Sequence, residues 1–230
     1  MNSNSPLSKK WYDSFTEWRT AAVEQVFGLQ RSENLPALEK WLLNPAEQYP
    51  CPPTIDLETW RKNLIRFHFS WNEYELMAGF IGPVLASISF VGQHYAIFHQ
   101  RELALDYEGQ HTEGKVDGLV ALGAFDPEMP FFFIHEYKRS QGFDADPEGQ
   151  LLIAMVAAQH LNNDGQPMYG CYIVGTYWRF VLLEGKQYAV SQGYDATDPT
   201  ELRIIWRILH HTKLIIEERV AAILAAIQNQ

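Results

Sequence analysis

The chain has 230 residues, of which 47% are hydrophobic and 20% are charged, so it can bury a real core and is not a disordered protein. Eighteen lysine and arginine residues oppose 28 aspartate and glutamate residues, which gives a net charge of -10. This charge excludes a protein that coats nucleic acid or an anionic membrane by bulk attraction, but it does not exclude a local basic groove.

Cysteine usage and the N-terminus favour a reducing compartment. The two cysteines, Cys51 and Cys171, form no Cys-x-x-Cys pair, which excludes a zinc ribbon and a dithiol redox motif. The polar N-terminus has no apolar stretch suited to a signal peptide. Residues 76–100 lack Asp, Glu, Lys and Arg, but glycines, a proline and histidines interrupt them, so we interpret them as a buried helix followed by a strand. We therefore expect a cytoplasmic protein with no membrane partner.

The first third of the chain is expected to be helical. Apolar residues recur at helical spacing over 10–27, and shorter helical stripes follow near 36–43 and from Leu57 to Phe67. Prolines at 45–53 predict a stiff loop that no helix crosses. The next predicted helix covers 71–88. We expect residues 1–70 to form an N-terminal helical extension on an α/β domain over 71–230, the two making one compact unit.

Strand patterns then take over. Phe131 to Ile134 is apolar without alternation, which is typical of a strand buried on both faces. Asp146 and Pro147 predict a helix start. The expected order is strands at 90–98 and 102–108, a hairpin connection at 109–114, strands at 115–124 and 131–138, a helix at 147–161, strands at 168–174, 177–184 and 187–191, and a long C-terminal helix from Pro199. This order predicts an α/β fold with a central mixed sheet flanked by helices.

One group of polar residues lies on two of the predicted strands. Asp117 lies in one strand, and Glu136 and Lys138 lie at the end of the next. Period two places Glu136 and Lys138 on the same face, with Tyr137 on the other. Charged groups that follow a buried strand directly are unfavourable unless they are paired or liganded. A simple ion pair between Glu136 and Lys138 is one explanation.

A metal site is the second explanation. If the two strands pair, Asp117 lies beside Glu136, and two neighbouring carboxylates repel each other. Mg²⁺ or Mn²⁺ removes that repulsion, because a divalent cation takes oxygen ligands such as two carboxylates and a backbone carbonyl. Lys138 would then orient a water and offset charge on a phosphate under attack.

The pattern resembles the PD-(D/E)XK nuclease superfamily, which has the restriction-endonuclease-like fold. The matching residues are Asp117, in Val116-Asp117-Gly118, and Glu136-Tyr137-Lys138, and the resemblance covers about residues 71–175. It implies that Asp117 and Glu136 hold the metal and that Lys138 assists hydrolysis. It also implies nucleic acid, DNA in the first place, as the partner. Dimers are frequent in this family, and the apolar C-terminal helix could take part in a homodimer.

The resemblance also points to supporting residues. Members of this family often carry a further acid on the helix before the sheet, and Glu73 is favoured for this role as a third metal ligand, with Glu75 as the alternative. Both could instead be first-turn acids that stabilise the helix dipole. Gln150 and Tyr137 are further candidates for the site. However, Ala154 follows Gln150 where the RecB-like branch has tyrosine, so that branch is not supported.

Two functions follow from these patterns. The first is a metal-dependent nuclease with Asp117, Glu136, Lys138 and Glu73 in the active site. The second is a non-catalytic protein of the same fold that binds nucleic acid or a protein partner and keeps Glu136 and Lys138 as an ion pair. Fold resemblance alone does not choose between them.

Overall fold

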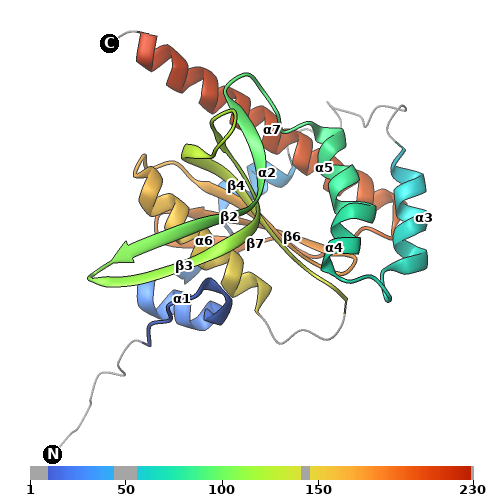
Figure 1. Ribbon diagram of the computed structural model, residues 1–230, viewed down its shortest axis with the longest axis horizontal. Coiled ribbons are helices and arrows are strands. Elements are labelled where there is room, and N and C mark those ends of the chain that lie inside the picture. The colour runs from blue at the N-terminus through green and yellow to red at the C-terminus, as the bar shows by residue number, and fades with distance from the viewer. Residues whose placement is uncertain (1–9, 44–55, 141–145, 229–230) are drawn as a thin grey trace, which may run out of the picture.

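A mixed β-sheet with helices on both faces forms the centre of the computed structural model, which describes residues 10–43, 56–140 and 146–228 (Figure 1). Over these residues the strand order is β1-β7-β6-β5-β4-β3-β2, and β8 pairs with β6. The strands are β1 (Gln30–Arg31), β2 (Tyr95–Tyr107), β3 (Gln110–Leu122), β4 (Glu128–Lys138), β5 (Met168–Val174), β6 (Tyr177–Glu184), β7 (Gln187–Val190) and β8 (Tyr194–Asp195). The predicted α/β class with a mixed sheet is thus confirmed.

The helices are η1 (Phe15–Glu17), α1 (Thr20–Phe27), α2 (Pro36–Leu43), α3 (Leu57–Phe67), α4 (Glu73–Leu76), the π-helical turn η2 (Met77–Ile81), α5 (Gly82–Ile88), α6 (Pro147–Asn162) and α7 (Pro199–Gln228). The long C-terminal helix is confirmed as α7, and it runs diagonally across Figure 1. Among the described residues no helix is both long and apolar enough to cross a membrane. Cys51 and the predicted proline-rich loop lie outside the described residues.

The strands that carry the candidate site form an antiparallel meander. β2 pairs with β3 and β3 pairs with β4, both antiparallel, whereas β4 pairs with β5 in parallel. The parallel pair requires a crossover, and α6 supplies it. The run from Phe131 to Ile134 is at most 7% exposed, which confirms a strand buried on both faces.

Two apolar cores hold the helices against the sheet. Helices α2, α3, α4, α5 and α7 contribute to one core, and η1, α1 and α6 contribute to the other. The start of α6 is fixed by Asp146, whose carboxylate caps Gly149 N at 2.9 Å and also accepts from Thr20 N at 2.7 Å. One aspartate therefore joins α6 to the start of α1.

The helix predicted over 10–27 is wrong in its first half. Only η1 and α1 are helical there, because Trp18 is extended, with φ -70° and ψ 135°. The Trp18 indole donates to Tyr12 O and to Thr112 Oγ1, each at 3.1 Å, and Ser14 bridges to Glu113 of β3. These contacts with the sheet outweigh the helical spacing of the apolar residues.

The boundaries of the first strands also differ from the prediction. The segments predicted at 90–98 and 102–108 form the single strand β2, and the predicted hairpin connection shortens to a turn at Glu108 and Gly109. The strand predicted at 115–124 begins earlier, at Gln110, and the strand predicted at 131–138 also begins earlier, at Glu128. β2 is continuous because nearly all its residues pair with β3, yet Gln100 keeps a positive φ of 54° inside it.

Candidate active site

Asp117 and Glu136 flank the last pair of the β3–β4 ladder. Gly118 pairs with His135, and Asp117 and Glu136 are the next residues along these two antiparallel strands, so a continued register places them beside each other. Residues at opposed positions project their side chains to the same face. The predicted pairing of these two strands is confirmed.

The carboxylate of Asp117 is held by two donors. The side-chain amide of Gln100 donates to Oδ1 at 2.8 Å, and the backbone N–H of Tyr137 donates to Oδ2 at 2.9 Å. Gln100 lies in β2 between residues that pair with Gly118 and Val116, so it faces Asp117 across the strands. Gln100 was not predicted from the sequence, because its contact with Asp117 depends on the register of β2 and β3.

Glu136 and Lys138 form a close ion pair on one face of β4. Lys138 Nζ donates to Glu136 Oε1 at 2.6 Å, and the two side chains are only 14% and 11% exposed. On the other face the rings of Phe133, His135 and Tyr137 follow one another, with centroids 6.3 and 6.1 Å apart. The predicted alternation along this strand is confirmed.

The helix before the sheet brings a third carboxylate to the pair. Glu73 Oε1 lies 3.9 Å from Lys138 Nζ, and its side chain is 44% exposed. Glu75 instead caps the start of α4. Its carboxylate accepts from Asn72 N at 2.8 Å while Asn72 Oδ1 accepts from Glu75 N, which is a capping box. Of the two candidate acids on this helix, Glu73 is the one that reaches Lys138.

Gln150 contacts a different part of the chain. Its side-chain amide donates to Thr16 O at 3.2 Å and is 7% exposed, so it joins α6 to the N-terminal segment. Tyr137 contributes its backbone N–H to Asp117, and its side chain is buried. Burial, followed by the charge of Asp117, raises the pKa of Tyr137 to about 12, so the phenol stays protonated at neutral pH.

Negative charge is in excess at this site. Burial, and then the charge of Asp117, raises the pKa of Glu136 to about 7, although Lys138 acts in the opposite direction. Burial by itself would lower the pKa of Lys138, but Glu136, Asp117 and Glu73 outweigh it and raise that pKa. Three carboxylates thus surround one ammonium group, and the buried carboxylate gains a proton more easily than usual.

The raised pKa of Glu136 predicts a pH-dependent stability of the metal-free protein. The folded state holds this proton between pH 4.5 and about 7, whereas the unfolded chain releases it at its ordinary pKa. Because the folded state then binds more protons, the contribution of Glu136 to stability falls as pH rises through this window, by about 3 kcal/mol in all. Urea unfolding of wild type and Glu136→Gln in EDTA across this range measures it.

The difference between the two proteins isolates Glu136. His135, whose pKa burial lowers to about 3, titrates in the opposite sense, but it is present in both proteins and cancels. We expect the wild type to lose stability relative to Glu136→Gln as pH rises. A difference that stays constant from pH 4.5 to about 7 would contradict a raised pKa.

The donor set fits a divalent cation in part. Asp117 and Glu136 supply carboxylate oxygens on opposed strands, and the excess negative charge is what an oxygen-seeking cation offsets. Within the described ranges, however, no group of three His, Cys, Asp or Glu side chains is gathered closely enough to hold a metal ion. A metal would therefore be held by these two carboxylates, completed by backbone oxygen and water.

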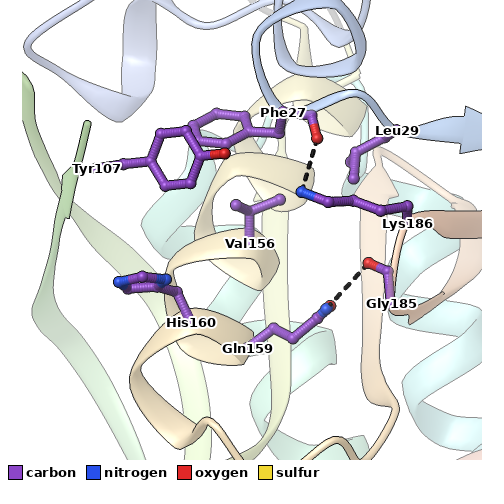
Figure 2. Close-up of a pocket in the computed structure, with 8 residues that line it drawn as sticks. All are labelled: Phe27, Leu29, Tyr107, Val156, Gln159, His160, Gly185 and Lys186. Carbon is purple, nitrogen blue, oxygen red and sulfur yellow. Dashed lines mark hydrogen bonds between the residues drawn. The ribbon is translucent and has the colours of Figure 1, made fainter.

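A separate pocket of about 250 Å³ lies between α1, α6 and the β6–β7 turn (Figure 2). Two of its polar side chains bond the backbone: Lys186 Nζ donates to Phe27 O at 2.8 Å, and Gln159 Nε2 donates to Gly185 O at 3.1 Å. None of the carboxylates discussed above lines it. We therefore assign this pocket to packing and not to the chemistry at Asp117 and Glu136.

Comparison with known proteins adds no relative: no family model matches the chain, and no curated protein matches it.

Proposed function

We propose that the protein is a metal-dependent nuclease with a restriction-endonuclease-like core. One observation carries the proposal: Asp117 and Glu136 directly follow the last pair of the paired strands β3 and β4, with Lys138 on the face of Glu136. The order of elements supports it, since helices α4 and α5, the meander β2–β4, helix α6 and the parallel strand β5 follow the family's order.

Each side chain has a distinct role in this proposal. Asp117 and Glu136 hold Mg²⁺ or Mn²⁺, and Glu73 adds an outer carboxylate. The cation, when bound, supplies charge that polarises the scissile phosphate and favours ionisation of a nearby water. Lys138 has three N–H donors, of which one bonds Glu136, so it can orient the attacking water and stabilise charge developing on phosphate.

Hydrolysis then proceeds in one displacement. The water oxygen forms a bond to phosphorus, the bond from phosphorus to the leaving ester oxygen breaks, and a proton passes to that oxygen. Gln100 and Tyr137 N hold the carboxylate of Asp117 in place throughout. Such preorganised charge is usually the largest contribution to catalysis.

A second function is favoured because the same side chains already have partners within the protein. Glu136 is paired with Lys138 at 2.6 Å, and both oxygens of Asp117 accept hydrogen bonds, so these groups have partners without a metal. A protein of the same fold that only binds nucleic acid or a protein partner would need no more. Such a protein would bind Mn²⁺ no better than a variant without Asp117.

The test is a cleavage assay on single- and double-stranded DNA and RNA, linear and circular. We expect cleavage of at least one substrate with Mg²⁺ or Mn²⁺ and none with EDTA. A folded, monodisperse protein that cuts no substrate and shows no Mn²⁺ binding in calorimetry would overturn the proposal in favour of the binding protein.

A further inference from the structure

Aromatic side chains gather at the corner between α3 and α4, where the chain also provides Glu73. Two of them are unusually exposed: Phe69 is 73% exposed and Tyr74 is 80% exposed. Five ring-bearing residues occupy the eight positions from 67 to 74: Phe67, His68, Phe69, Trp71 and Tyr74. Large rings left in water are unfavourable, so a cluster of them indicates a surface that meets another molecule. We call residues 67–74 the aromatic corner.

The aromatic corner is an ordered part of the fold. The rings of Phe67 and Trp71 stack with centroids 5.8 Å apart, and the rings of His68 and Phe69 lie 3.8 Å apart. Ser70 Oγ donates to Phe67 O at 2.9 Å, and the capping box at Asn72 fixes the start of α4. The exposed rings are therefore presented on a fixed backbone, which lowers the entropy lost when a planar ligand stacks on them.

The aromatic corner contacts the candidate active site through two connections. His68 Nδ1 lies 3.1 Å from Ser140 Oγ, and Ser140 follows Lys138 by two positions. Tyr74 follows Glu73 directly, and Glu73 Oε1 is 3.9 Å from Lys138 Nζ. The neighbours of Phe69 and Tyr74 in the chain, His68 and Glu73, thus join the aromatic corner to the segment carrying Lys138.

The charge of the protein decides which polymer this surface suits. With a net charge of -10, bulk attraction to phosphates cannot supply the affinity, although Arg66 places one guanidinium 4.9 Å from the Phe67 ring. Stacking of bases on aromatic rings is independent of charge and of sequence. In a duplex the base faces are hidden, whereas in a single strand they are free.

From the exposure of these rings, their support and their position beside Lys138, we infer that the aromatic corner is a stacking platform and that the substrate is single-stranded nucleic acid. This inference rests on the proposed nuclease function, and it names the substrate class of the same site. Phe69 and Tyr74 act in binding, and neither takes part in the hydrolysis.

The test separates binding from cleavage. Anisotropy with a short fluorescein-labelled single strand, and with a duplex of the same sequence, is measured in EDTA, where no cleavage occurs. We expect the single strand to bind more tightly than the duplex, and each of Phe69→Ala and Tyr74→Ala to weaken it by about 5-fold or more. Phe69→Tyr and Tyr74→Phe keep a ring and should bind as wild type does.

A matched control comes from another exposed aromatic residue. Phe125 is 89% exposed, and it lies in the β3–β4 connection, at the opposite end of β4 from Glu136. Phe125→Ala should change the dissociation constant by less than about 2-fold.

The salt dependence of binding gives a second check. Because few phosphates are neutralised, a plot of log affinity against log salt concentration should have a shallow slope of about -1.

Each outcome decides one of the two proposals. Equal affinity for duplex and single strand, unchanged binding in both alanine variants, or no binding of nucleic acid would overturn the stacking platform, and the last would favour a protein partner for the aromatic corner. Metal-dependent cleavage of a single strand with an unchanged KM in the double variant Phe69→Ala/Tyr74→Ala would refute the platform and leave the nuclease standing. Ring-dependent binding without cleavage of any substrate would refute the nuclease and retain the platform.

Discussion

Replacing Lys138 with alanine is expected to lower metal-dependent cleavage by about 10²–10³-fold, the usual effect of removing one group that stabilises transition-state charge. The side chain is 14% exposed and its Nζ lies 2.6 Å from Glu136 Oε1, so no solvent cation replaces it easily. The effect should fall on kcat, because the developing negative charge is present only in the transition state. Initial rates at saturating substrate and metal provide the measurement.

Two further variants separate chemistry from folding. Lys138→Gln keeps a donor for Glu136 but removes the charge, so it should lose activity while retaining more stability than the alanine variant. Lys115→Ala removes a lysine that is 60% exposed on β3, and its rate should stay within about 2-fold of wild type. Full activity in both Lys138 variants would exclude the proposed role.

The positions of Asp117, Glu136 and Lys138 could be predicted because each depends on local rules. Two consecutive strands pair as a hairpin, which places Asp117 near Glu136, and period two places Lys138 on the face of Glu136. The apolar run before Glu136 showed that its surroundings are buried. These conclusions need only the alternation of side chains and the order of strands.

Contacts between distant segments could not be predicted in the same way. Gln100 reaches Asp117 from β2, where it has a positive φ of 54°, and nothing in the surrounding sequence signals this contact. Trp18 fits the helical stripe over 10–27, yet its indole bonds Thr112 across 94 positions and breaks that helix. In both cases tertiary hydrogen bonds outweigh local propensity, which is worth less than about 1 kcal/mol per residue for most side chains.

The aromatic corner could be predicted only in part. The sequence shows its five rings, and their spacing fits a helical stripe that continues into a core. The structure instead leaves Phe69 and Tyr74 exposed, because the chain turns between α3 and α4. In contrast, Trp178 and Phe180, two rings of β6, are fully buried. The exposure of Phe69 and Tyr74 depends on the turn between α3 and α4, which the sequence pattern does not predict.

Replacing Gly118 with alanine is expected to destabilise the protein by about 2–3 kcal/mol through overpacking. Gly118 is buried in β3 directly across from His135, and a Cβ at this position would overlap the His135 ring at Nε2 and Cε1. That ring is fully buried and packs among Phe133, Tyr137 and His99, so it cannot turn away. Urea unfolding at neutral pH in EDTA measures the loss.

Gly193 provides the matched control, because a Cβ there would meet its nearest neighbour, Arg179, at an ordinary 3.6 Å. Gly193→Ala should change stability by less than about 1 kcal/mol. The double variant Gly118→Ala/His135→Ala removes the overlap, so its loss should be smaller than the sum of the two single losses. Additive losses, or equal effects of Gly118→Ala and Gly193→Ala, would rule out the overlap. Because Gly118 follows Asp117 and His135 precedes Glu136, the same overlap should also separate the two carboxylates and lower cleavage in Gly118→Ala.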